Sequence, residues 1–293
     1  MTTLAKARTG PLLRAMVRRL RAAGLATARQ DAELFLARVL GTTRLALHLD
    51  PEREIDADRL AALETLAARR ERQEPLQYLL GEAEFLGLSL AVGPGVFIPR
   101  PETELLVERA LAVCPRGPAM ALDLCTGSAA VACGLAAQRP ALSVWAVELS
   151  PDAGRWARRN VERLGLAARV RVLEGDLTAP LAGLGLEGRC DLVVANPPYI
   201  ARPALGSLPA EVRGFEPALA VDGGGDGLAV IRRILAEAPA YLRAGGRVLL
   251  EIGHDHGDRL RAHLAAEPRY GVPVFCRDLL GFERVLDVEV LTR

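Results

Sequence analysis

Cysteine and histidine are both scarce in this sequence of 293 residues, which contains five cysteines and four histidines. The cysteines are scattered, and no two of them form a Cys-x-x-Cys pair: Cys114, Cys125, Cys133, Cys190 and Cys276. This spacing argues against a zinc site and against a scaffold held by disulfides. The histidines also lack paired ligand spacing, so we expect no metal site.

Excess charge and long apolar runs are missing as well. The chain has 37 Lys and Arg residues against 36 Asp and Glu residues, so no strong overall field selects nucleic acid or a membrane surface. No apolar run approaches the roughly 18 residues of a membrane span, and the first ten residues, MTTLAKARTG, lack the apolar centre of a signal peptide. We therefore expect a soluble, cytoplasmic protein.

Apolar residues at helical spacing dominate the N-terminal part of the chain. Three short helices are predicted there, at about 12–20, 28–40 and 56–72. The segment that follows carries short apolar runs broken by glycines, which favours a β-hairpin over another helix. We expect three parts: an N-terminal helical substrate-recognition domain (1–75), a β-hairpin linker (76–98) and a catalytic domain (99–293).

From Pro99 onward, apolar runs alternate with amphipathic segments. This alternation predicts an α/β fold with a mostly parallel sheet of seven strands and helices on both faces. The last two strands are joined by too few residues for a helix, so we expect an antiparallel pair at one edge. The predicted strands are 120–124, 143–149, 169–175, 191–195, 247–253, 272–278 and 283–291, and the predicted helices are 102–113, 128–138, 152–164, 226–243 and 255–266.

The first predicted strand ends in a turn of small residues. Asp123 lies at the strand tip and is followed by Thr126, Gly127, Ser128 and Ala129, where a helix begins. Small side chains let a ligand approach the backbone and the free N–H groups of the helix. The dinucleotide fingerprint G-x-G-x-x-G is not met. The carboxylate of Asp123 suits a cationic or zwitterionic ligand better than a pyrophosphate.

Acidic residues also end the next two predicted strands. Glu148 follows Gly127 by 21 positions, where a carboxylate with two oxygens matches the two hydroxyls of a ribose. After the third strand, Asp176 suits the amino group of an adenine, and Leu177 suits the face of its ring. Together these residues predict a nucleoside-binding site at the carboxyl edge of the sheet.

The fourth strand ends in the sequence Asn196-Pro197-Pro198-Tyr199. Each proline forces the preceding residue into an extended conformation, and neither proline has an N–H group. The loop therefore presents two acceptors, the side-chain oxygen of Asn196 and the carbonyl of Pro197, next to the flat ring of Tyr199. Two convergent acceptors and a ring are typical of a site for a planar –NH2 group.

A planar –NH2 group beside a nucleoside site suggests methyl transfer from S-adenosylmethionine. The sulfonium of that cofactor is cationic, in keeping with the carboxylate of Asp123. The two acceptors would hold the amide and stabilise the positive charge that grows on its nitrogen, without a strong general base. Glu251, His254 and His256 are interpreted as polar residues at the end of a strand.

Longer stretches resemble the HemK/PrmC family of release factor glutamine methyltransferases. The similar segments are EPLQYLLGEAEFLGLSLAVGPGVFIPRPETELLVERAL (74–111), DLCTGSAAVA, NPPYI, FEPALAVDGGGDGLAVIRRIL and LLEIG. The resemblance implies a class I S-adenosylmethionine-dependent methyltransferase fold. It also implies that the N-terminal bundle helps to recognise a protein substrate, and that the reaction is N5-methylation of the glutamine in the Gly-Gly-Gln motif of bacterial peptide chain release factors.

The resemblance also implies roles for single residues. Residues 125–129, Glu148, Leu177 and Asn196 would contact the cofactor, residues 196–199 would hold the glutamine, and Phe97, Arg100 and Glu102 would lie near the pocket. Three departures stand out. Cys125 and Ala129 replace two glycines of the family loop, Glu148 replaces the commoner Asp, and Leu177 replaces a common Trp. We expect the methyl group of Ala129 to stand where the backbone passes close to the cofactor, and so either to reduce cofactor affinity or to displace the loop slightly.

Three alternatives stay open. The sequence DLCTG also occurs in the sister family that methylates a glutamine of a large-subunit ribosomal protein, although RPETE favours the release factor branch. A nucleic-acid adenine methyltransferase shares the NPPY motif, but it predicts a basic groove that the near-neutral charge does not supply. The third is a cofactor-binding or regulatory module whose loop, altered at Ala129, no longer supports turnover. We expect a monomer with release factors as its partners and with no direct nucleic-acid target.

Overall fold

The computed structural model describes residues 7–291. The chain divides into two compact units, Met1–Gly81 with Pro209–Phe215, and Glu82–Leu208 with Glu216–Arg293. This division assigns residues 76–81 to the helical unit and the hairpin to the larger unit, whereas the sequence predicts boundaries at 75 and 98. Residues 1–6 of the predicted N-terminal domain lie outside the described part of the chain.

The smaller unit is a bundle of short helices around an apolar core that includes Leu20, Phe35 and Leu63. The three predicted helices are present, but the sequence missed three more, α3, α5 and α9. The segment 76–80 is therefore helical, and the expectation of a hairpin over this stretch was wrong. The elements are β1 (Ala7–Arg8), α1 (Thr9–Ala22), α2 (Ala28–Leu40), α3 (Arg44–Leu49), β2 (Glu54–Ile55), α4 (Ala57–Arg70), α5 (Leu76–Leu80) and α9 (Ala210–Phe215).

A buried arginine joins the two chain segments of this unit. The guanidinium of Arg70 is 3% exposed and donates to Asp31 on α2 over 2.7 Å and to Glu211 on α9 over 2.8 Å. A buried guanidinium is stable only when carboxylates compensate the loss of water. Arg70 therefore ties α9, which is distant in sequence, to the N-terminal helices.

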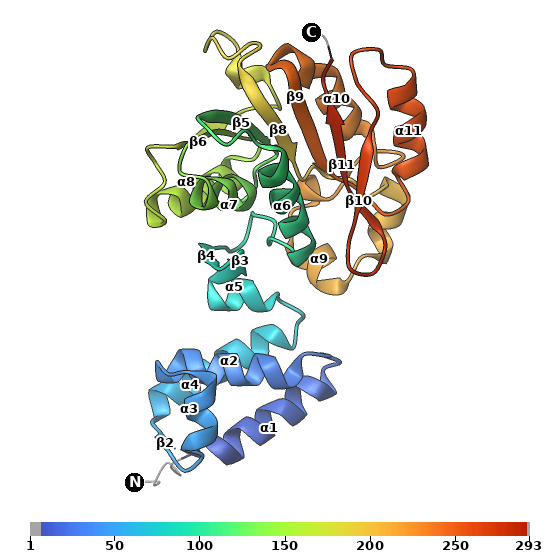
Figure 1. Cartoon of the computed structure of the whole chain (residues 1–293). Coiled ribbons are helices and arrows are strands. Elements are labelled where there is room, and N and C mark those ends of the chain that lie inside the picture. Colours follow the sequence, from blue (N-terminus) through green and yellow to red (C-terminus); the bar gives the residue numbers. More distant parts are fainter. Residues whose placement is uncertain (1–6, 292–293) are drawn as a thin grey trace. The chain divides into compact units, whose positions relative to one another are not determined.

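The larger unit contains a sheet of seven strands in the order β10-β11-β9-β8-β5-β6-β7 (Figure 1). The five strands from β9 to β7 in this order are parallel, and β11 runs antiparallel to both β9 and β10. The predicted α/β fold with an antiparallel edge is thus confirmed. The strands are β5 (Ala119–Leu124), β6 (Leu142–Glu148), β7 (Val170–Glu174), β8 (Cys190–Ala195), β9 (Leu242–Glu251), β10 (Val274–Arg277) and β11 (Glu283–Glu289).

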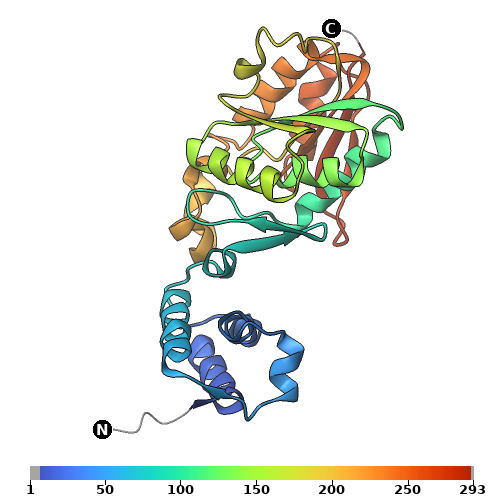
Figure 2. The ribbon, with the colours of Figure 1, turned by 90° about the vertical axis from the view of Figure 1, so that its left-hand side faces the viewer.

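Helices cover both faces of this sheet, and α7 and α8 cross the near face in Figure 2. Successive strand residues such as Val193 and Val194 belong to opposite core layers, because side chains alternate across a strand. The helices are α6 (Glu104–Val113), α7 (Ala130–Gln138) and α8 (Pro151–Arg163) in one layer, and α10 (Ala229–Glu237) and α11 (Gly257–Ala265) in the other. No helix among residues 7–291 is long and apolar enough to cross a membrane.

The hairpin of β3 (Glu82–Phe85) and β4 (Leu88–Ala91) packs on the larger unit. Its Phe85 and Leu90 are buried in the same core layer as α7. The buried amide of Asn160 on α8 accepts from the Ala91 N–H over 2.6 Å and donates to the carbonyls of Ala91 and Ser128 over 3.0 and 2.9 Å. One asparagine thus fixes the hairpin to the turn after β5.

Candidate active site

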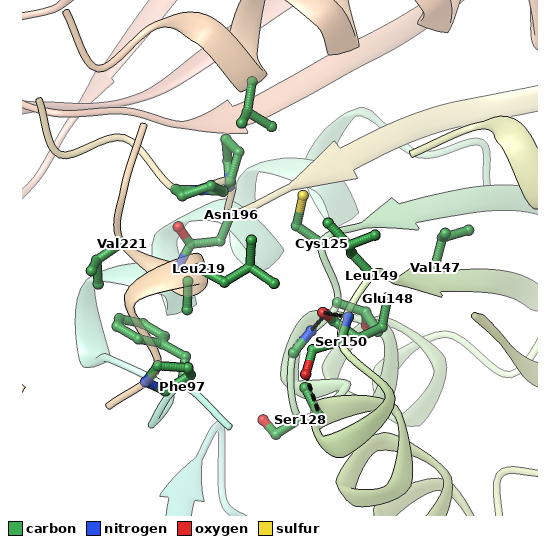
Figure 3. A pocket seen from close by; sticks show the side chains of 18 of the residues that line it. Phe97, Cys125, Ser128, Val147, Glu148, Leu149, Ser150, Asn196, Leu219 and Val221 are labelled. Atoms are coloured by element: carbon green, nitrogen blue, oxygen red, sulfur yellow. Dashed lines mark hydrogen bonds between the residues drawn. The ribbon is translucent and has the colours of Figure 1, made fainter. Parts of the chain in front are cut away.

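A pocket opens at the carboxyl ends of the parallel strands, where ligands bind in sheets of this type. Figure 3 shows Phe97 and Asn196 on one side of it, and Glu148 and Ser150 on the other. Most of the predicted site residues line this pocket: Phe97, Asp123, Cys125, Thr126, Gly127, Ser128, Glu148, Asp176, Leu177, Asn196, Pro197, Pro198 and Tyr199. Ala129, Arg100 and Glu102 are not part of its lining.

The turn after β5 owes its shape to left-handed backbone conformations. Cys125, Gly127 and Ala129 have φ angles of 58°, 57° and 62°. A non-glycine residue in this region costs about 1–2 kcal/mol. The side chain of Ala129 is fully buried in the hydrophobic core, so its methyl group does not stand where a ligand would pass the backbone. The expected position of this methyl group was therefore wrong, whereas its effect on cofactor affinity stays a prediction. A residue other than glycine at this φ angle places strain in the backbone.

Asp123 forms a buried acidic wall of the pocket. Its Oδ2 atom accepts from the hydroxyl of Thr126 over 2.5 Å and from the Ala132 N–H over 3.0 Å. Its Oδ1 atom has no hydrogen-bond partner within the described residues. Burial raises the pKa of Asp123 to about 7. A buried carboxylate oxygen without a donor suits a cationic ligand that would pair with it.

Glu148 is held in place by backbone groups. Its Oε2 atom accepts from the Gly127 N–H and its Oε1 atom from the Ser150 N–H, both over 2.8 Å. Burial raises the pKa of this carboxyl above its usual range. Each oxygen keeps a second acceptor position, because a carboxylate has about four. The two oxygens can therefore still accept from a pair of hydroxyls.

Asp176 and Leu177 complete this half of the pocket. Asp176 accepts from the guanidinium of Arg233 on α10 over 2.9 Å. The sequence interpretation missed Arg233, which also lines the pocket. Leu177 is buried and has a φ of 47°. The pocket therefore has an apolar wall beside a carboxylate that is already paired with an arginine.

The other half of the pocket is built around the loop after β8. The Asn196 Nδ2 atom donates to the hydroxyl of Thr103 over 3.0 Å, and the Tyr199 hydroxyl donates to Glu251 over 3.1 Å. The Tyr199 ring also makes an edge-to-face contact with His256, with 6.3 Å between centroids. Both ends of the four-residue motif are thus held by side chains from other segments.

The glycine-rich segment 222–227 packs directly against this loop. A Cβ atom on Gly223 would lie 2.8 Å from the Tyr199 Cα, and one on Gly227 would lie 2.5 Å from the Tyr199 carbonyl oxygen. No side chain fits at either distance, so glycine is required at both positions. The sequence interpretation gave these glycines no role, although DGGGDG was among the segments that resemble the family.

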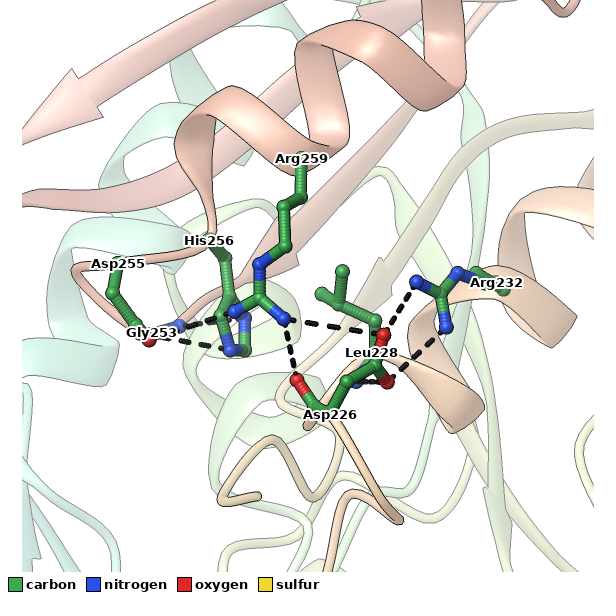
Figure 4. A network of polar contacts seen from close by, with 7 residues as sticks. All are labelled: Asp226, Leu228, Arg232, Gly253, Asp255, His256 and Arg259. Carbon is green, nitrogen blue, oxygen red and sulfur yellow. Dashed lines mark hydrogen bonds and ion pairs between the residues drawn. The ribbon is translucent and has the colours of Figure 1, made fainter.

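Arginines hold the far end of the same segment. Asp226 accepts from Arg232 over 2.6 Å, and the carbonyl of Asp226 accepts from Arg259 over 2.8 Å (Figure 4). The hydrogen bonds with Arg232 help to lower the pKa of Asp226 to about 2. These contacts fix the segment that covers Tyr199.

Arg100 supports the pocket from outside. Its guanidinium lies over the ring of Phe97, 4.6 Å from the centroid, and pairs with the buried Glu216. Glu216 also accepts from the Ile98 N–H over 3.0 Å. Arg100 and Glu216 therefore hold Phe97 in the lining without entering the pocket themselves.

Two family models and several known proteins match this chain. Residues 11–81 match the family model for the PrmC N-terminal domain, and residues 100–213 match the model named conserved hypothetical protein 95. A release factor glutamine methyltransferase of Mycolicibacterium smegmatis is 49% identical over 80% of both chains. One of Geobacter sulfurreducens is 45% identical over 78% of both chains.

The chain belongs to the release factor glutamine methyltransferase family. Solved structures with lower identity share the fold. A methyltransferase from Pyrococcus furiosus is 21% identical with a TM-score of 0.51, over 81% of this chain and 100% of that one. A human methyltransferase 10 domain containing protein is 16% identical with a TM-score of 0.51, over 71% and 90%. The class I methyltransferase fold predicted from the sequence is thereby confirmed.

Proposed function

We propose that this chain transfers a methyl group from S-adenosylmethionine to the side-chain amide nitrogen of the glutamine in the Gly-Gly-Gln motif of bacterial peptide chain release factors. The observation that carries the proposal is the loop after β8. It brings Asn196 and Pro197 to a pocket that also contains a buried, partly unpaired carboxylate, that of Asp123. Membership of the family supports the choice of glutamine.

The half of the pocket that β5, β6 and β7 form suits the cofactor. Asp123 would pair with its positive charge, Glu148 would accept from its ribose hydroxyls, and Leu177 would cover its adenine. When bound, S-adenosylmethionine supplies a methyl group on a positively charged sulfur. The departure at Ala129 does not reduce this fit, because its side chain lies in the core. The hypothesis of a cofactor-binding module without turnover rested on Ala129, so the burial of this side chain removes its main support.

The other half of the pocket suits the substrate amide. The Asn196 Oδ1 atom and the Pro197 carbonyl would accept the two N–H groups, and Tyr199 and Phe97 would flank the plane of the amide. Both hydrogen bonds would become stronger as positive charge develops on the nitrogen during methyl transfer. Because they stabilise the transition state more than the bound substrate, they would lower the barrier. The methylated nitrogen then loses a proton to restore a neutral amide, so no base is needed before the transfer.

The test is methyl transfer to candidate substrates in parallel. The protein is incubated with isotopically labelled S-adenosylmethionine and purified release factors, ribosomal proteins or nucleic acid, and the label is localised by mass spectrometry. We expect one methyl group on the glutamine of the Gly-Gly-Gln motif. A label on a ribosomal-protein glutamine or on adenine would contradict the substrate, and cofactor binding without any transfer would contradict the enzyme.

A further inference from the structure

Four side chains from three distant segments form a continuous chain of hydrogen bonds at the substrate half of the pocket. Asn196 Nδ2 donates to Thr103 Oγ1 over 3.0 Å, and the Thr103 hydroxyl donates to Glu251 Oε2 over 2.6 Å. Tyr199 donates to Glu251 Oε1 over 3.1 Å. Thr103 and Glu251 are both 2% exposed. Water therefore does not replace either partner readily.

The carboxylate gives this chain a fixed direction. Glu251 accepts through both of its oxygens, from Tyr199 and from Thr103, so the single hydrogen of the Thr103 hydroxyl points to Glu251. Thr103 then has only lone pairs left for Asn196, and these accept from the –NH2 end of the amide. Burial raises the pKa of Glu251, while the hydrogen bonds from Thr103 and Tyr199 favour its ionised form.

Asn196 needs such a constraint because the two ends of an amide are nearly the same size. A 180° turn of the side-chain amide exchanges oxygen for nitrogen with little change in packing. With the amide inverted, a donor would face the –NH2 group of the substrate, and one of the two acceptors would be lost. Correct orientation therefore depends on a neighbour that distinguishes the two ends.

We infer that Thr103 and Glu251 are positioning residues that orient the Asn196 amide so that its oxygen faces the substrate nitrogen. The inference rests on the function proposed above. Neither residue is required to exchange a proton with the substrate. They act on methyl transfer by orienting Asn196. Their loss should therefore lower the rate of transfer and leave cofactor affinity unchanged.

Single-turnover methyl transfer to release factor at saturating cofactor tests this inference. Thr103→Val keeps the shape of the side chain and removes the hydroxyl, and Thr103→Ser restores the hydroxyl. We expect Thr103→Val to lower the transfer rate by about 10–100-fold, as for other residues that orient a functional ligand. The Kd of S-adenosylmethionine should stay within about twofold, and Thr103→Ser should recover most of the rate.

A second buried threonine provides a matched control. The Thr178 hydroxyl donates to Glu237 over 2.6 Å, the same distance as in the Thr103 pair, but Thr178 does not line the pocket or bind Asn196. Thr178→Val should therefore cost similar thermal stability and leave the transfer rate near that of the wild type. Thr103→Ala serves as a second variant if Thr103→Val does not fold, with the same expected loss.

Three results would overturn the inference. The first is a Thr103→Val rate within about threefold of the wild type, which is too small for an orienting role. The second is an equal loss of rate in Thr178→Val, and the third is a loss that resides in the cofactor Kd. A wild type that methylates no release factor would contradict the proposed function, and this inference with it. An active wild type combined with any of these three results would contradict the inference alone.

Discussion

The two halves of the pocket are built by different means. In the cofactor half, backbone groups set the geometry: Glu148 is held by two N–H groups, and the turn around Gly127 depends on left-handed φ angles. In the amide half, side chains set the geometry, through the hydrogen bonds that join Asn196, Thr103, Glu251 and Tyr199.

This difference has a consequence for mutation. A site shaped by the backbone keeps its geometry as long as the main-chain conformation survives. Cys125 and Ala129 are examples, because both adopt the left-handed φ angles of the turn although neither is glycine. A site shaped by side-chain hydrogen bonds depends on single atoms, because each lost partner leaves a buried polar group unsatisfied. We therefore expect the amide half to control the transfer rate and the cofactor half to control affinity.

Asn196→Ala should give the largest effect. It removes one oriented acceptor, which costs about 2–4 kcal/mol of barrier, or roughly 30- to 900-fold in rate, by analogy with the loss of one oxyanion-hole donor. Cofactor affinity should change far less. Single-turnover rates and calorimetric titration of S-adenosylmethionine measure the two effects separately. Near-normal turnover would contradict the role of the Asn196 amide. It would also contradict the expectation that the amide half of the pocket controls the transfer rate.

Asp123→Asn should give the complementary pattern, weaker cofactor binding at an intact amide half. Removal of the charge should cost about 1.5–3 kcal/mol of affinity, the usual range for a hydrogen bond to a charged group. The rate of transfer at saturating cofactor should fall much less than in Asn196→Ala. A variant that binds the cofactor as tightly as the wild type would contradict the pairing of Asp123 with its positive charge.

The affinity for S-adenosylmethionine should also depend on pH through the ionisation of Asp123. Because burial raises the pKa of Asp123 to about 7, the carboxyl of the free protein is largely protonated at pH 5.5 and half ionised at pH 7. A cationic ligand favours the ionised form, so affinity should rise by about tenfold over this interval. The Asp123→Asn variant shares all other titrations and should lack this rise. Parallel curves for both proteins would contradict it.

The smallest effect concerns two neighbouring alanines in the cofactor half. Ala129 is buried with a φ of 62°, whereas the buried Ala130 begins the helix α7. Ala130→Gly should lower the free energy of unfolding by about 0.5–1 kcal/mol. Ala129→Gly also relieves left-handed strain, so its free energy of unfolding should be about 1 kcal/mol higher than that of Ala130→Gly. Urea unfolding without cofactor measures both. Equal losses would show that Ala129 carries no strain.

The larger unit was the easier part of the fold to predict. Its central strands are buried on both faces, so they appear in the sequence as apolar runs such as LVVA (192–195). Short helices were harder, because the five residues of α5 (76–80) are too few to display a helical period. The predicted helix 226–243 was also too long. The helix α10 ends at Glu237, close to Pro239, which cannot continue a regular helix.

The functional site also contains some features that the sequence predicts and others that it does not. Residues at the ends of strands could be predicted because parallel strands end at one edge of a sheet; Glu148 is the last residue of β6, and Asn196 follows β8 directly. The outward or inward direction of Ala129 could not be, since it depends on a φ angle that the sequence does not reveal. Thr103 and Glu251 are separated by 148 positions along the chain. Only the folded sheet brings them together, so Glu251 was interpreted as an ordinary polar residue at a strand end.

The central claim is that the amide half of the pocket selects a glutamine side chain. The most direct measurement compares labelled methyl transfer to a release factor with transfer to the same factor carrying asparagine in place of the Gly-Gly-Gln glutamine. We expect one methyl group per molecule on the natural factor and none on the altered one, because the shorter side chain does not bring its nitrogen to Asn196 and Pro197. Equal labelling of both factors would contradict the account.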